Sequence, residues 1–228
     1  MQRFDINLFL IIFLIGVLFS AIGAVANYLR DRKRLSVMTA FAEEIGLTFT
    51  PAASAGFLAR MKIFKLFTVG RSKKIKNVVF GETDDETVSI FDYQYAVGSG
   101  KNQTIHRQSV VSIESPNLNA PSFVLRPASF FLSFGRIFGQ PEIEFDSNPD
   151  FGKYQQLQGS DEKAIKEFFD DRFLRTLESN KYCIEAIGHN LIVYIPRKSF
   201  NSDELKAVMA SAFEIYSAMV ERGASLAR

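Results

Sequence analysis

Chemically useful side chains lie on both sides of a glycine-rich turn in the middle of the chain. Asp92 precedes the turn at 98–101, and His106 and Arg107 follow it. If residues 98–101 form the loop of a β-hairpin, counting back along the strands pairs Asp92 with Arg107. A carboxylate and a guanidinium opposite each other in a sheet usually form a structural ion pair. A concave site exposing His106 or Asp92, with Arg107 close by, would instead favour an enzyme.

The turn sequence at 98–102, Gly-Ser-Gly-Lys-Asn, superficially resembles a phosphate-binding loop. Such a loop needs glycine where Tyr95 stands, serine or threonine where Asn102 stands, and a helix after it. Both flanks here have the composition of strands. A hairpin turn is therefore the favoured interpretation, and we expect no nucleotide.

Asp146, Asn148 and Asp150 have the alternating spacing of the first ligands in a calcium loop. That loop needs glycine where Phe151 stands and glutamate where Leu157 stands. We expect a turn after a strand, with a weak cation site as the alternative.

The remaining candidate groups also favour structural roles. Only two histidines occur, which excludes a histidine-rich metal centre. Cys183 lies in an apolar segment and is expected to be a buried small hydrophobe rather than a nucleophile. Glu142, Glu144 and Asp146 alternate along one expected strand, as a solvated edge or an acidic docking strip. The sequence therefore assigns no catalytic, cofactor-binding or metal-binding residue and no cofactor.

An apolar run from Leu8 to Ala26 fixes where these groups work. At about 1.5 Å of helical rise per residue, the run approaches the length that crosses a roughly 30 Å hydrocarbon core. We expect one transmembrane anchor within residues 1–29. The alternative is a cleaved signal peptide, because Ala24-Val25-Ala26 has the small-x-small form of a cleavage site. The apolar run is, however, longer than the core of a typical signal peptide.

The basic residues beside the anchor predict its orientation. Four of the five residues 30–34 are basic, whereas the other flank offers Arg3, partly offset by Asp5. The more basic flank stays in the cytoplasm. We therefore expect a single-pass protein of the cell membrane with a cytoplasmic domain, and a lone cysteine, which forms no internal disulfide, agrees.

Three small residues repeat at four-residue spacing within the anchor: Gly16, Ser20 and Ala24. They share one face of the helix, where a second helix can approach closely. A homodimer through the anchor is one interpretation. The other is that small residues are simply common in membrane helices.

Charge is distributed unevenly along the rest of the chain. Residues 30–76 hold 11 Lys and Arg against 3 Asp and Glu, and residues 77–228 hold 15 against 21. A basic region next to an anchor is typical of binding to anionic lipid. Nucleic acid is not the expected partner, because the excess is confined to one segment without a reading motif.

Residues 54–69 carry apolar residues at helical spacing with basic residues between them, which predicts a basic amphipathic helix. This helix would pack on the core or lie against the bilayer. The candidate lipid-facing residues are Arg60, Lys62, Lys65, Arg71, Lys73, Lys74 and Lys76.

The fold class we predict is α+β: an N-terminal transmembrane helix, then a mostly antiparallel sheet domain with flanking helices. We divide the chain into an anchor (1–29), a basic juxtamembrane helical region (30–76) and an α+β domain (77–228), with 30–228 one folded unit. Expected strands cover 47–50, 77–80, 87–97, 104–113, 122–126, 142–146, 154–158, 182–187 and 191–196. Expected helices cover 36–45, 160–177 and 201–223.

A phenylalanine cluster follows the fourth expected strand and comprises Phe130, Phe131, Phe134 and Phe138. It would cover the sheet as a short helix, or remain exposed as an apolar surface that receives a partner.

The segments 91–102, 125–127 and 143–146 resemble an uncharacterised group of bacterial membrane-anchored proteins. The resemblance implies a bacterial single-pass protein with a cytoplasmic α+β domain, and it implies no activity. We expect a membrane-anchored interaction or scaffold module with an unknown protein partner. The alternative is a membrane-associated, hydrolase-like enzyme using Asp92, His106 and Arg107.

Overall fold

The body of the protein is built on one eight-stranded antiparallel sheet. The structure, a computed structural model, describes residues 2–130 and 142–226, with side chains described from Leu8 onward. The strands follow the order β1-β2-β3-β4-β8-β7-β5-β6. Their bounds are β1 Thr48–Ala52, β2 Arg71–Glu82, β3 Thr87–Val97, β4 Thr104–Glu114, β5 Ala120–Pro127, β6 Gln155–Gly159, β7 Cys183–Gly188 and β8 Asn190–Tyr194. The α+β class is thereby confirmed.

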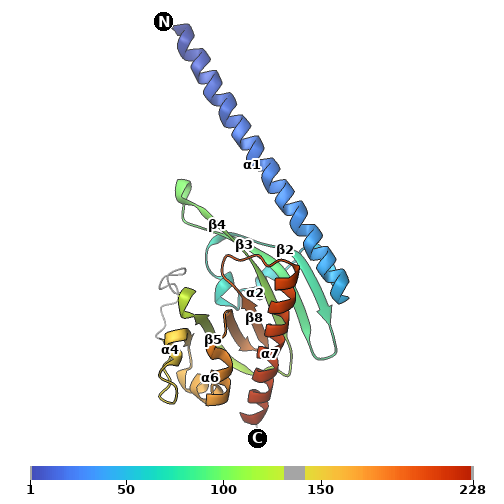
Figure 1. The fold of residues 1–228 in the computed structure, drawn as a ribbon, viewed down its shortest axis with the longest axis vertical. Coiled ribbons are helices and arrows are strands. Elements are labelled where there is room, and N and C mark those ends of the chain that lie inside the picture. Colours follow the sequence, from blue (N-terminus) through green and yellow to red (C-terminus); the bar gives the residue numbers. More distant parts are fainter. Residues whose placement is uncertain (1, 131–141, 227–228) are drawn as a thin grey trace.

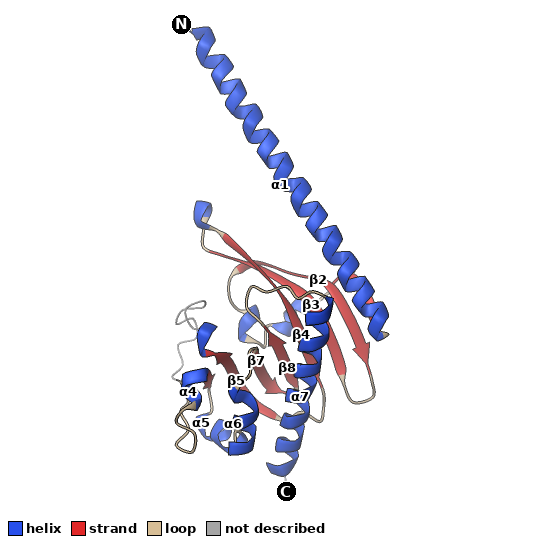
Figure 2. Ribbon diagram, in the orientation of Figure 1, coloured by secondary structure: helices blue, strands red, loops and turns tan. Residues whose placement is uncertain are grey.

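Helices cover both faces of this sheet, and one of them extends far beyond it (Figures 1 and 2). The α-helices are α1 Gln2–Ile45, α2 Phe57–Met61, α4 Phe151–Tyr154, α5 Glu162–Phe168, α6 Asp171–Glu178 and α7 Ser202–Leu226. The 3-10 turns are η1 Lys65–Phe67, η2 Gly100–Asn102 and η3 Ala128–Phe130.

Alternation along the strands divides the core into two clusters. Ile90 packs with the end of α1 and with α5, α6 and α7 on one face. Its neighbour Phe91 packs with α2 and η1 on the other face. Successive side chains of a strand point to opposite faces, so one sheet supports both clusters.

The apolar anchor and the first core helix are a single element, which corrects the expectation of a separate helix over 36–45. α1 runs 44 residues without a break because nothing between Ala26 and Ile45 is glycine or proline. Its last turns bury Met38 and Phe41 completely in the core. The helix then ends at Gly46, whose φ of 72° suits a residue without a side chain.

The single amphipathic helix expected over 54–69 is wrong. The chain forms only α2 and η1 there, because Phe64 between them is extended, with φ −86° and ψ 144°. The break allows Phe57, Met61 and Phe67 to reach the sheet together. The basic residues from Arg71 onward belong to strand β2 and not to a helical region.

Two further expectations are corrected in the second half of the chain. Residues 142–146 form no strand, although Ile143 donates a backbone hydrogen bond of 2.8 Å to Leu157. The helix expected over 160–177 is two helices, because Asp170 begins α6 by accepting a bond from the Phe173 amide. Across this break the ring centroids of Phe169 and Phe173 are 5.0 Å apart.

The C-terminal helix begins as its sequence predicts. The Glu204 amide donates to Oδ1 of Asn201 at 2.9 Å, and the Asn201 amide donates to Oε2 of Glu204 at 3.0 Å. This reciprocal pair is a capping box. The helix passes Gly223, where we expected it to stop, and continues to Leu226, the last residue described.

Candidate membrane-facing site

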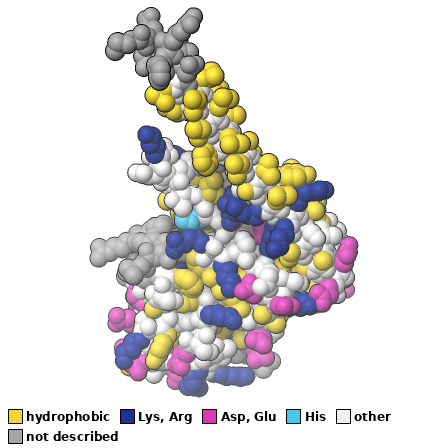
Figure 3. Space-filling view, turned by 45° about the horizontal axis from the view of Figure 1, so that its top comes forward, with side chains coloured by type: hydrophobic (Ala, Val, Ile, Leu, Met, Phe, Trp, Pro, Cys, Tyr) yellow, Lys and Arg dark blue, Asp and Glu magenta, His cyan; other side chains and the backbone are white. Residues whose placement is uncertain are grey.

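α1 begins with an exposed apolar segment and becomes rich in basic residues where that segment ends. The most hydrophobic 18-residue window of this helix has a mean hydropathy of 2.9 and none of it is buried. The helix is therefore long and apolar enough to cross a membrane. Lysine and arginine side chains gather where it meets the body, while acidic side chains lie further along the body (Figure 3).

A salt bridge joins α1 to the sheet at this junction. Arg34 donates through Nε and Nη2 to the two oxygens of Asp92, both at 2.7 Å. Each side chain is only 16% exposed. Charge-assisted bidentate pairing of this kind is strong and directional. The pair therefore holds the helix in one orientation on β3.

Two further side chains complete the coordination of Asp92. Asn77 donates through Nδ2 at 2.9 Å and Ser109 through Oγ at 3.2 Å. With the two bonds from Arg34, the carboxylate accepts four hydrogen bonds. Asp92 is thus occupied as a structural acceptor, which leaves it poorly placed to act as a general base.

The same network reaches the loop before α7. Arg34 donates through Nη1 to the backbone carbonyl of Phe200 and through Nη2 to Ser109 Oγ at 2.9 Å. The Phe200 amide donates to Ser109 Oγ at 3.0 Å. One arginine therefore ties α1 to β3, β4 and the β8–α7 loop. We call Arg34, Asn77, Asp92 and Ser109 the anchor joint.

A strand irregularity places Asn77 in the joint. The β2–β3 register shifts between Lys76 and Val79, and Asn77 has a φ of 51°. Asparagine tolerates this left-handed conformation better than most residues. A bulge redirects a side chain relative to its strand neighbours, and here the redirected amide meets Asp92.

The expected pairing of Asp92 with Arg107 is wrong. Asp92 faces Ser109, and Arg107 faces Gln94, because the hairpin closes with six residues, 98–103, rather than four. The two-residue slip keeps each side chain on its face of the sheet. Nε of Arg107 donates to Gln94 at 2.9 Å, and the partner of Asp92 is Arg34.

A cavity of about 130 Å³ lies beside the anchor joint. Its walls come from α1, β2, β3, β4 and the loop before α7. The lining residues are Arg30, Asp31, Arg34, Lys74, Lys76, Asn77, Asp92, Tyr93, Gln94, Arg107 and Ser199. Five are cationic and two are anionic. We call this space the basic cavity.

The structure separates the candidate lipid-facing residues. Lys74 and Lys76 line the basic cavity. Arg71 and Lys73 also belong to β2 but do not line this cavity; Arg71 donates to Gln103 and Lys73 to the Thr68 carbonyl beside η1. Burial, followed by the charge of Lys62, lowers the pKa of Lys73. The other three candidates, Arg60, Lys62 and Lys65, belong to the α2–η1 segment, which covers the opposite face of the sheet.

The β3–β4 hairpin projects from the body in the direction of the anchor (Figure 1). β4 pairs with β8 only from Val110 onward, so the outer hairpin extends past the rest of the sheet. Val97 and Ile105 flank the tip and are 41% and 45% exposed. No acidic residue occurs between Tyr93 and Ile113. The tip is therefore apolar and basic.

Most of the phenylalanine cluster, Phe131, Phe134 and Phe138, lies outside the described residues. Phe130 is described, half-buried, and packs on the α2–η1 side of the core. The three acids Glu142, Glu144 and Asp146 are all exposed, as expected. The segment that carries them is not a strand.

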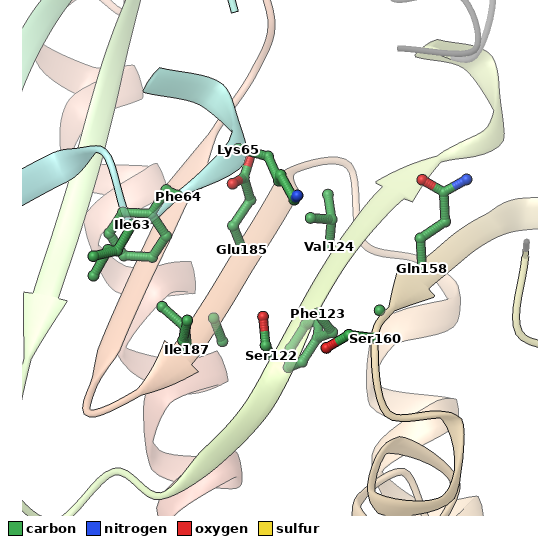
Figure 4. Close-up of a pocket in the computed structure, with 12 residues that line it drawn as sticks. Ile63, Phe64, Lys65, Ser122, Phe123, Val124, Gln158, Ser160, Glu185 and Ile187 are labelled. Atoms are coloured by element: carbon green, nitrogen blue, oxygen red, sulfur yellow. The ribbon is translucent and has the colours of Figure 1, made fainter. Parts of the chain in front are cut away.

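A second cavity, of about 100 Å³, opens near β7 (Figure 4). Glu185 lies beside it, fully buried, and accepts bonds from the Leu66 amide at 3.1 Å and from Tyr194 Oη at 2.8 Å. Burial raises the pKa of Glu185 despite these bonds. Sequence reasoning missed this residue, whose one signal is an acid within an otherwise apolar strand.

The other reactive groups that the sequence singled out are a cysteine and a histidine on the strands. Cys183 is completely buried, and burial raises the pKa of its thiol, which makes it a poor nucleophile. Burial, then the charge of Arg197, lowers the pKa of His106, whose ring lies 5.2 Å from that of Tyr95. Among the residues that the structure describes, no group of three or more His, Cys, Asp or Glu side chains is arranged to hold a metal.

Comparison with known proteins gives a fold relationship. No protein-family model and no curated protein matches the chain. Among solved structures, the chain is similar to the crystal structure of the mycobacterial trehalose monomycolate transport factor A, TtfA. The TM-score is 0.58 at 13% identity, over 82% of this chain and 95% of that one. At this identity the likeness shows the fold alone.

Proposed function

We propose that this chain is a single-pass membrane-anchored module whose domain lies in the cytoplasm and docks its basic, anchor-side surface on anionic lipid. The observation that carries the proposal is the continuity of α1. One helix contains the membrane-spanning segment, the salt bridge to Asp92 and the buried Met38 and Phe41. No flexible linker separates anchor from domain, so the domain has a defined orientation relative to the bilayer.

That orientation directs basic residues toward the membrane. Arg30 is four residues beyond Ala26, or about 6 Å of helical rise. Lys74 and Arg107 line the same cavity as Arg30. About 1 kcal/mol is available per Lys or Arg near an anionic surface. The exposed Val97 and Ile105 at the hairpin tip would add apolar contact at the interface.

The cytoplasmic location rests on the basic residues 30–34 that follow the apolar segment. The solved neighbour is by name a transport factor. We extend to this chain only the general idea of an accessory protein that works beside another component. We also propose that the chain has a protein partner, whose identity is unknown. The bacterial origin of the chain, suggested by the resemblance at 91–102, is likewise part of the proposal.

The structure offers the enzyme alternative little support within its described residues. Asp92 accepts four hydrogen bonds, and Arg107 is engaged with Gln94 on the same face. A hydrolase would need a free general base. The Asp92 carboxylate is occupied, and an arginine stays protonated and does not fill that role.

The proposal is tested with full-length protein in nanodiscs of phosphatidylcholine, with and without phosphatidylglycerol. We expect hydrogen exchange at the tip, 98–103, to slow when the anionic lipid is present. The double variant Lys73→Gln/Lys74→Gln should lose most of this protection. The matched control Lys163→Gln removes an exposed charge on α5 and should keep it. Equal exchange in both lipids would refute docking.

A further inference from the structure

The basic cavity lies at the depth of lipid headgroups. A bilayer is about 40–45 Å thick with a hydrocarbon core of about 30 Å, which leaves about 5–7 Å of headgroup layer on each side. Arg30 follows the apolar segment by about 6 Å of helical rise, and it lines the cavity. With Ala26 at the edge of the hydrocarbon core, the Arg30 end of the cavity is level with lipid phosphates.

Charge within the cavity is not balanced. Asp92 is paired with Arg34 at 2.7 Å, and Asp31 with Lys76 at 3.1 Å. These pairs account for both acids of the lining. Across the described residues, no acidic side chain pairs with the other three cations, Arg30, Lys74 and Arg107. Three uncompensated positive charges thus surround one small space.

The cavity is also held in shape before any ligand arrives. The anchor joint fixes α1 against β2 and β3, which form two of its walls. Arg107 is oriented because its Nε donates to Gln94 at 2.9 Å, which leaves its terminal nitrogens to serve another acceptor. A planar guanidinium suits the oxygens of a phosphate, and an ammonium supplies a point charge beside it.

We propose that the basic cavity binds the phosphate of one anionic phospholipid per chain, with Arg30, Lys74 and Arg107 as its ligands. The inference rests on the proposed membrane docking and adds a defined site to it. The lipid is the source of the phosphate because the cavity lies within the headgroup layer beside the helix that crosses it. The acyl chains of the bound lipid would remain in the bilayer along α1.

The test is native mass spectrometry of full-length protein in mild detergent, titrated with phosphatidylglycerol. We expect one lipid to be retained per chain. Two control lipids should be retained at least about tenfold less well. In phosphatidylcholine the choline ammonium offsets the phosphate charge, and oleate is anionic but has no phosphate. Inorganic phosphate at millimolar concentration should not displace the lipid. Displacement would indicate a soluble phosphate ligand and overturn the assignment.

Two variants locate the site. Lys74→Gln and Arg107→Gln should each weaken retention about fivefold, as about 1 kcal/mol per cation implies. The control Lys163→Gln should bind as the parent does. Arg107→Lys keeps the charge and should restore part of the affinity. A thermal unfolding curve for each variant confirms that it is folded, and a folded Arg107→Gln that binds like the control would overturn the site.

The exchange and retention measurements together separate the two proposals. If phosphatidylglycerol still slows exchange at the tip, 98–103, while Arg107→Gln leaves lipid retention unchanged, the docking surface stands and the cavity assignment falls. If phosphatidylglycerol neither slows exchange at the tip nor is retained by the protein, both proposals fall.

Discussion

The anchor joint gives a quantitative prediction about how tightly α1 is held. The Arg34–Asp92 pair is mostly buried, with 16% of each side chain exposed. Removing one partner of a buried pair costs 3–5 kcal/mol because the other charge remains uncompensated. Because the pair is still partly exposed, we expect a cost at the lower end of this range. We expect Arg34→Met and Asp92→Asn each to lower the free energy of unfolding by about 3 kcal/mol.

The double variant isolates the pair itself. Because each single change already removes the ion pair, the two costs should not add, and the coupling energy should be about 2 kcal/mol. The assay is denaturant unfolding of full-length protein in detergent micelles. Tyrosine fluorescence can report it, since the chain has seven tyrosines and no tryptophan.

A second salt bridge from α1 to the sheet, here to β2 rather than β3, is the matched control. Lys76 and Asp31 are 3.1 Å apart but 44% and 61% exposed. Exposed pairs contribute about 0–1 kcal/mol. The Lys76→Gln/Asp31→Asn cycle should therefore show at most half the coupling. If Arg34 and Asp92 couple no more strongly than this pair, the reasoning that α1 is fixed at the joint is refuted.

Three further predictions concern the rest of the fold. The native state holds the proton of Glu185 to higher pH than the unfolded chain, whose value is near the ordinary 4.5. The free energy of unfolding should therefore decline as pH rises from about 4.5 through the raised native pKa, and Glu185→Gln should remove that part of the decline in pH-dependent denaturant titrations. Gly70→Ala should cost about 2 kcal/mol in the same assay, because Gly70 has a φ of 71° and its new Cβ would lie 2.7 Å from the Ala96 carbonyl oxygen. Asn201→Ala should cost about 1 kcal/mol by removing the capping box with Glu204, and a change below 0.3 kcal/mol would contradict that role.

Local patterns predicted the elements that depend on neighbours in the sequence. The β3–β4 and β7–β8 hairpins, the start of α7 and the apolar anchor all follow from alternation, turn residues and capping within a few positions. These signals also predicted the α+β class. They act over the same short range as the interactions that form each element.

The site depended on contacts that no local pattern specifies. Arg34 and Asp92 are 58 positions apart, and Arg34 has the same signature as the other basic residues that orient an anchor. The hairpin loop is two residues longer than the sequence predicted. Arg107 therefore faces Gln94 instead of Asp92, on the same face of the sheet. The break between α2 and η1 lets Phe57 and Phe67 join the same core cluster, a tertiary contact that the local helical pattern does not specify.

The most direct test of the account measures how close the hairpin tip lies to the membrane. Full-length protein would carry a nitroxide on a cysteine placed at Lys101 or at Lys163, with native Cys183 buried and unreactive. Nanodiscs would contain phosphatidylglycerol and a lipid with gadolinium on its headgroup. We predict strong relaxation of the label at Lys101 and little at Lys163. Equal relaxation at the two positions would contradict a domain held with its basic surface on the bilayer.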